Sequence, residues 1–107
     1  MIHIPKAEYT RRRKALMAQM EPNSIAILPA AAVAIRNRDV EHVYRQDSDF
    51  QYLSGFPEPE AVIVLMPGRQ HGEYVLFCRE RNVERELWDG LRAGTEGAIS
   101  DFGADDA

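Results

Sequence analysis

The chain has 107 residues, of which 45% are hydrophobic and 28% are charged, and its formal net charge is −4 at pH 7. This length supports one domain that buries roughly two-thirds of its unfolded surface, and the composition is ordinary for a folded globular protein. The acidic balance argues against a nucleic-acid partner. No apolar run approaches the roughly 18 residues needed to cross a bilayer, and the N-terminus lacks a signal-sequence pattern, so we expect a cytoplasmic protein.

The first predicted element is an amphipathic helix near the N-terminus. Tyr9, Leu16, Met17 and Met20 recur at intervals that fit one helical face, and a proline stands on each side of the pattern. The basic run at 11–14 could bind phosphate, but a single basic turn on an acidic chain more often forms a solvated helix face. We therefore expect this run to lie on the surface.

Three short apolar runs predict β-strands. The run 24–28 follows a turn, and it is long enough for a strand but too short for a helix. The runs 61–66 and 74–77 are separated by a polar connector with two glycines, which predicts a hairpin. Residues 30–35 fit more than one structure, and the polar residues 36–41 are interpreted as a loop.

Three shorter helices are predicted from capping and turn residues. A cluster of large rings between Phe50 and Phe56 predicts a short helix that ends at a tight corner at Gly55. Asn82 can cap a helix that runs through Leu87, and the residues 95–101 predict another. Helices and strands therefore alternate, which favours an α/β layered domain over a sandwich or a bundle.

Two pairs of carboxylates raise the question of a metal site. Asp47 with Asp49, and Glu58 with Glu60, alternate so that both side chains of a pair could lie on one side of an extended segment. A structural explanation competes with this one, because Asp47 can cap the helix that follows it and Glu58 lies in a turn bounded by prolines. The structural explanation is the one we favour, and we predict no metal ligand in this chain.

No other residues form a recognisable set of a catalytic nucleophile, a base and an orienting group. His3, His42 and His71 are isolated in polar surroundings and are expected on the surface. Cys78 is the only cysteine, so no intrachain disulfide can form, and its apolar neighbours predict a buried free thiol. We therefore predict no catalytic residue in this chain.

The most specific pattern is the segment from Tyr44 to Val62, YRQDSDFQYLSGFPEPEAV, which combines aromatic, acidic and turn residues in a fixed order. It resembles a segment of the N-terminal domain of the bacterial Xaa-Pro aminopeptidases (aminopeptidase P) of the creatinase and prolidase superfamily. The run LWDGLR at 87–92 and the order of the helix and strand patterns agree with the same family. Gln51 departs from the pattern, because an aromatic residue is common at that position.

The resemblance implies a mixed sheet flanked by helices, similar to the ribonuclease H architecture. It also implies that residues 1–107 are an incomplete N-terminal domain, and that the catalytic domain, which holds two manganese ions in this family, lies outside the chain. The expected function is that of a non-catalytic part of a metallo-aminopeptidase that removes the first residue of peptides with proline second. Its expected partners are its own catalytic domain, the peptide substrate and other subunits of a homo-oligomer, a tetramer in the full-length form. The alternative is a stand-alone binding or scaffold module without hydrolase activity.

The most specific functional prediction concerns Trp88. It is the only tryptophan, and it lies at the end of a predicted helix before an Asp-Gly turn, where its ring could be packed in the core or partly exposed. The resemblance implies that it projects toward the active site of a neighbouring subunit and helps to close the substrate pocket. Arg45, Phe50, Tyr52 and Arg92 are further interface candidates, because arginine and aromatic side chains are enriched at protein contacts.

Overall fold

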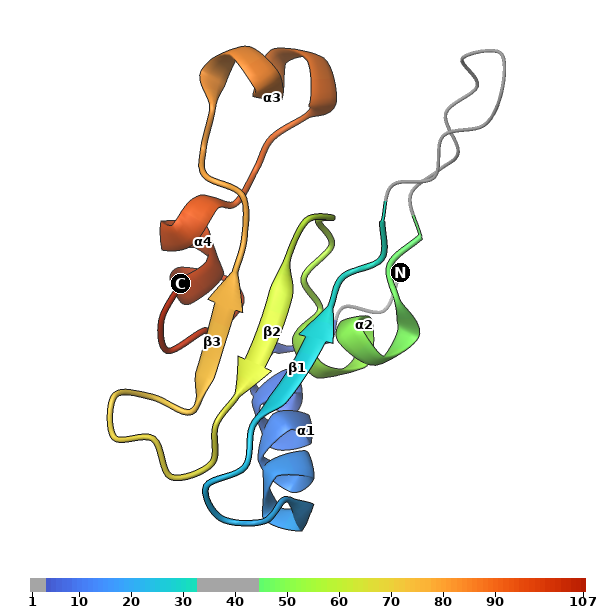
Figure 1. Ribbon diagram of the computed structural model, residues 1–107. Helices are drawn as coiled ribbons and strands as arrows, with labels where there is room; N and C mark the ends of the chain where they lie inside the picture. The colour runs from blue at the N-terminus through green and yellow to red at the C-terminus, as the bar shows by residue number, and fades with distance from the viewer. Residues whose placement is uncertain (1–3, 33–44) are drawn as a thin grey trace.

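The computed structural model describes residues 4–32 and 45–107, and it shows a three-stranded sheet with helices packed against one of its faces (Figure 1). The elements are α1 (Lys6–Gln19), β1 (Ala26–Pro29), α2 (Ser48–Ser54), β2 (Val62–Leu65), β3 (Tyr74–Phe77), α3 (Val83–Asp89) and α4 (Gly94–Ser100). The alternation of helices and strands confirms the predicted α/β class. The predicted loop at 36–41, and His3 and His42, lie outside the described residues.

The sheet has the strand order β1-β2-β3, and both neighbouring pairs are antiparallel. The predicted hairpin of β2 and β3 is confirmed. Within the described ranges, a parallel pairing appears only as an isolated bridge between Val75 and Asp106, where the C-terminal residues lie along the free edge of β3. Beyond β1, the residues 30–32 are neither helix nor strand.

One face of the sheet carries the hydrophobic core. Ile63 pairs with Leu76 and Leu65 pairs with Tyr74 across the hairpin, and all four side chains are buried. Because side chains alternate along a strand, these residues point to the same side. Side chains from α1, α2 and α4 cover them, including Leu16, Phe50 and Ala98.

The short helix α2 owes its position to two local signals that the sequence predicted. A side-chain oxygen of Asp47 accepts hydrogen bonds from the backbone amides of Asp49 and Phe50, at 3.1 and 3.0 Å. Gly55 ends the helix in the left-handed region at φ 67°. A Cβ at this position would also lie 2.5 Å from the Tyr9 ring, so glycine is required by both conformation and space. Asp47 therefore acts as a helix cap.

The prediction that the whole basic run lies on the surface is wrong for Arg13, which is only 3% exposed. Its Nη1 donates to the carbonyl of Leu53 at 2.8 Å, and its guanidinium lies 4.0 Å from the centroid of the Tyr74 ring. Burial in these apolar surroundings lowers the pKa of Arg13 and raises the pKa of Tyr74 to about 12. The buried arginine thereby joins α1 to α2 and to β3.

The opposite face of the sheet is also apolar. Ile27, Val64 and Val75 lie in one cross-strand row, and Pro29, Val62 and Phe77 lie in the next. Ile27 is 61% exposed and Phe77 is 57% exposed, so no described element covers these two side chains. We call these six residues the outer face. A sheet that is apolar on both faces is normally covered on both.

We therefore expect the 107-residue chain to self-associate through the outer face. Replacing Ile27 with lysine should weaken this association at least roughly tenfold, because burial of one such side chain contributes about 1.5–3 kcal/mol. Sedimentation velocity over a concentration series measures the effect, with Ile99→Lys, the same change at an exposed isoleucine on α4, as the matched control. A wild-type chain that stays monomeric at high concentration and unfolds cooperatively would contradict this expectation.

Candidate functional site

Residues 79–93 form an arm that leads away from the sheet, with α3 near its tip (Figure 1). One connecting segment, 79–82, rises from β3, and the other, 90–93, returns to α4. No described side chain of α3 belongs to the core cluster. The arm is therefore held by its connections and not by apolar packing.

The arm exposes a group of large apolar side chains. Trp88 is 88% exposed, and the other members are similarly open, at 78–83%. We call this group the arm surface; it consists of Val83, Leu87, Trp88 and Leu91. Within the described residues, Trp88 is therefore not packed in a core.

Asn82 and Glu86 hold the two ends of α3. Asn82 caps the helix as predicted, because its side chain accepts a hydrogen bond from the Arg85 amide at 3.0 Å. Glu86 is only 8% exposed and accepts from the Asn82 amide at 3.0 Å and from the Arg92 amide at 2.7 Å. It also pairs with Nε of Arg81 at 2.9 Å. The hydrogen bond from the Arg92 amide is the main reason why the pKa of Glu86 is lowered.

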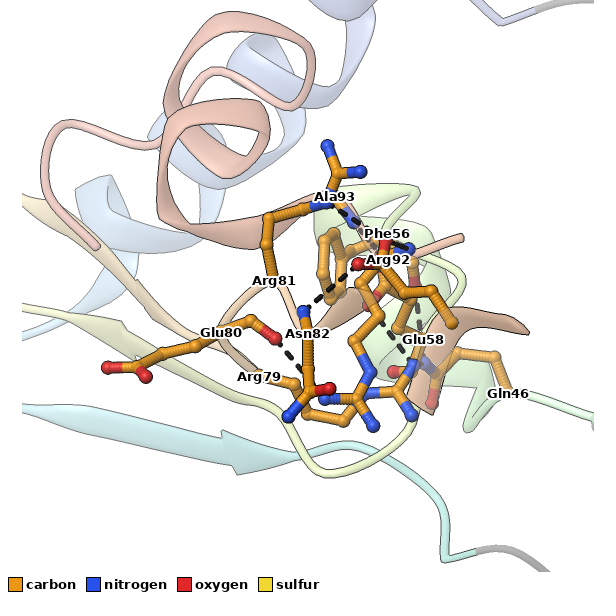
Figure 2. A network of polar contacts seen from close by, with 10 residues as sticks. Gln46, Phe56, Glu58, Arg79, Glu80, Arg81, Asn82, Arg92 and Ala93 are labelled. Carbon is orange, nitrogen blue, oxygen red and sulfur yellow. Dashed lines mark hydrogen bonds and ion pairs between the residues drawn. The ribbon is translucent and has the colours of Figure 1, made fainter. Parts of the chain in front are cut away.

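Glu58 fastens the base of the arm to the rest of the domain (Figure 2). One carboxylate oxygen accepts from the Ala93 amide at 2.7 Å, and the other lies 3.2 Å from Nη2 of Arg79. The side-chain amide of Gln46 donates to the carbonyls of Glu58 and Phe56 at 3.0 and 3.1 Å. Glu58 is thus engaged in a structural network, in agreement with the structural interpretation of its pair with Glu60.

Arg92, predicted as an interface residue, contributes to the arm itself. Its Nη1 donates to the carbonyl of Glu80 at 3.2 Å and so bridges the two connecting segments. The Nε atoms of Arg92 and Arg79 are buried without a hydrogen-bond partner in the described part of the chain. The structure therefore places Arg92 beside the arm surface, in a supporting position.

The remaining interface candidates lie around α2. Phe50 is fully buried in the core, so the prediction that it is available for an intermolecular contact is wrong. Arg45 and Tyr52 are exposed and line an open groove of about 580 Å³ together with Tyr9 and Gln51. The Arg12 guanidinium lies 4.4 Å from the centroid of the Tyr52 ring. Gln51, the departure from the family pattern, faces this groove and not the core.

The remaining residues that could act as ligands or nucleophiles are His71 and Cys78. His71 is exposed in the connector between β2 and β3, as predicted. Cys78 is half-buried, not buried as predicted; it packs against the core cluster just beyond the end of β3, and partial burial raises the pKa of its thiol. Among residues 4–32 and 45–107, no group of three or more His, Cys, Asp or Glu side chains could hold a metal ion. None of the described helices has the length and apolar character to cross a membrane.

Comparisons with known proteins give a consistent result. The family model of the aminopeptidase P N-terminal domain matches residues 9–107. The Xaa-Pro aminopeptidase of Escherichia coli is 45% identical over the whole of this chain, and that of Haemophilus influenzae is 38% identical. The solved structure of Pseudomonas aeruginosa aminopeptidase PepP is 83% identical over the whole chain, with a TM-score of 0.97. The structure of E. coli aminopeptidase P covers 99% of the chain at 45% identity, with a TM-score of 0.92.

This chain spans about a quarter of the length of these proteins: 24% of the E. coli enzyme, 25% of the H. influenzae enzyme and 24% of each of the two solved chains. The matched region is the N-terminal domain described by the family model. The fold and the family are thereby shown for the chain.

Proposed function

Because the chain belongs to the family of aminopeptidase P N-terminal domains, we propose that it is the non-catalytic N-terminal part of a metal-dependent Xaa-Pro aminopeptidase. Residues 1–107 are then part of a larger domain, and a catalytic domain follows in the same polypeptide. The role of the described residues is to support assembly and to shape the substrate pocket of a neighbouring subunit. The exposure of Trp88 at the end of an anchored arm is the observation that carries this proposal.

The physical argument begins with the arm surface. Four large apolar side chains exposed to water on one short arm are unfavourable unless another surface covers them. Tryptophan is enriched among the residues that dominate binding energy at protein contacts. An anchored arm can hold such a ring in one place, which lowers the entropy lost when a partner binds. These features support a contact through Trp88 with a second subunit.

The manganese ions that the family implies do not fit the described side chains. Asp47 is engaged by two backbone amides, Glu58 by an amide and an arginine, and Glu86 by two amides and an arginine. A two-metal centre needs several converging carboxylates, as in other hydrolases of this kind. The metal-dependent chemistry therefore belongs to the proposed catalytic domain.

We expect this chain alone neither to bind manganese tightly nor to cleave a Gly-Pro or Ala-Pro peptide. The reason is that no three acidic or histidine side chains converge among the described residues, and Asp47, Glu58 and Glu86 already hold structural hydrogen bonds. Isothermal titration calorimetry with Mn²⁺ and a peptide-cleavage assay on the purified chain test this expectation. A stoichiometric, submicromolar binding event would contradict it.

The proposed function itself is tested with the full-length protein. We expect hydrolysis of Ala-Pro-containing peptides, no comparable cleavage of Ala-Ala peptides, and loss of activity on metal removal with recovery on addition of Mn²⁺. Size-exclusion chromatography with light scattering should show an oligomer. A full-length protein that is monomeric, or that shows no preference for proline in the second position, would contradict the proposal.

A further inference from the structure

We propose that Glu86 is a positioning residue whose carboxylate joins both ends of α3 and so fixes the direction in which Trp88 points. The inference concerns Glu86 and the arm; its consequence for peptide turnover rests on the proposed function of Trp88.

The geometry shows why one side chain can hold the whole arm. One oxygen of Glu86 accepts from the Asn82 amide, which precedes α3, and the other accepts from the Arg92 amide, which follows it. Nε of Arg81 approaches the second oxygen as well. The carboxylate therefore closes a loop that begins at residue 81 and ends at residue 92, with Trp88 inside it.

Little else in the described residues restrains this loop. A helix of seven residues is not stable on its own in water, and α3 contributes no described side chain to the core. Glu58 holds Ala93 and Arg79, which lie at the base of the arm and outside the loop. Arg92 adds one bond across the loop, to the Glu80 carbonyl.

Because of Gly90, the C-terminal end of α3 depends on the hydrogen bond between the Glu86 carboxylate and the Arg92 amide. Gly90 has φ 96°, and no atom outside residues 89–91 lies within 4 Å of the position where a Cβ would stand. A glycine in open space can change its backbone angles at little cost. With the bond between Glu86 and Arg92 broken, the chain can rotate at Gly90 and carry Trp88 to other directions.

The test uses Glu86→Gln, which keeps the shape of the side chain but replaces one acceptor oxygen with a donor. At least one of the two backbone amides then faces a donor and loses its partner. Glu84→Gln is the matched control, because Glu84 lies on the same helix, is exposed and carries the same charge. Both variants are made in the full-length protein.

Hydrogen–deuterium exchange is the structural measurement. We expect amides in residues 82–92 to exchange roughly tenfold faster in Glu86→Gln, as expected for loss of a hydrogen bond to a charged group, while β2 and β3 keep their protection. Glu84→Gln should match the wild type. Unchanged exchange in the arm would overturn the proposal, and so would an equal loss of protection in the sheet, since that outcome indicates general destabilisation.

Steady-state kinetics with a proline peptide then examine the consequence for turnover. We expect KM to rise roughly fivefold in Glu86→Gln with kcat changed less than roughly twofold, because a displaced ring weakens pocket closure without altering the chemical groups. Faster exchange in the arm together with an unchanged KM would support the role of Glu86 in positioning and would contradict the proposed role of Trp88. The two failures are therefore distinguishable.

Discussion

Replacing Trp88 with alanine in the full-length enzyme is expected to lower kcat/KM for a proline peptide roughly thirtyfold, with almost no change in melting temperature. The ring is 88% exposed, so its removal leaves no cavity among the residues that the structure describes. An aromatic anchor at a subunit contact contributes on the order of 2 kcal/mol, which corresponds to that change in the specificity constant or in assembly. A core tryptophan would behave differently, because its truncation costs about 3–5 kcal/mol of stability.

Melting temperature, oligomeric state and kcat/KM measured on the same preparation separate these cases. Ile99→Ala is the control, since it removes another exposed apolar side chain at a position away from the arm. A large fall in melting temperature with unchanged activity per folded molecule would show that Trp88 acts through packing. A dissociated oligomer would place the effect in assembly, which the proposal also includes.

Elements set by local chemistry could be predicted from the sequence. The hairpin of β2 and β3 follows from two apolar runs around a glycine-containing connector, and α2 follows from Asp47 as its cap and Gly55 as its end. In each case the residues that decide the structure lie within a few positions of one another. The family resemblance rested on the same region, and the match of the family model to residues 9–107 confirms it.

Features that depend on distant parts of the chain could not be predicted in this way. Arg13 lies in a basic run typical of a solvated helix, and its burial depends on Leu53 and Tyr74, which are far away in sequence. Phe50 and Trp88 are both large rings next to turns, yet one is fully buried and the other is exposed. Composition cannot separate them, because their exposure is decided by which elements pack together.

The sequence gives only a weak indication of the structural role of Glu86. An acidic residue shortly after an N-cap commonly reaches back to the amide of the cap residue, and Asn82 with Glu86 is a variant of that arrangement. The second bond, from the Arg92 amide, has no such pattern in the sequence. This bond depends on the path of residues 90–93, which bring the Arg92 amide back to the Glu86 side chain.

Arg13→Ala is expected to destabilise the domain by about 3 kcal/mol. The substitution leaves the Leu53 carbonyl without its charged donor, removes the contact with the Tyr74 ring and empties the space of a long buried side chain. For a domain of this size each kcal/mol shifts the melting temperature by about 4–8 °C, so we expect a fall of about 12–24 °C. Thermal denaturation followed by circular dichroism measures it.

Two further variants identify the source of this effect. Arg11→Ala is the matched control on the same helix: its side chain is 64% exposed and its ion pair with Glu8 lies on the surface, so the change should stay within about 0.5 kcal/mol. Arg13→Met keeps a long apolar side chain but removes the charge and the donors. If Arg13→Met loses most of the stability lost in Arg13→Ala, the hydrogen bond and the contact with Tyr74 hold α1 to the sheet. If it is as stable as the wild type, packing alone accounts for the burial, because replacing a buried charge with a well-packed apolar group can be neutral.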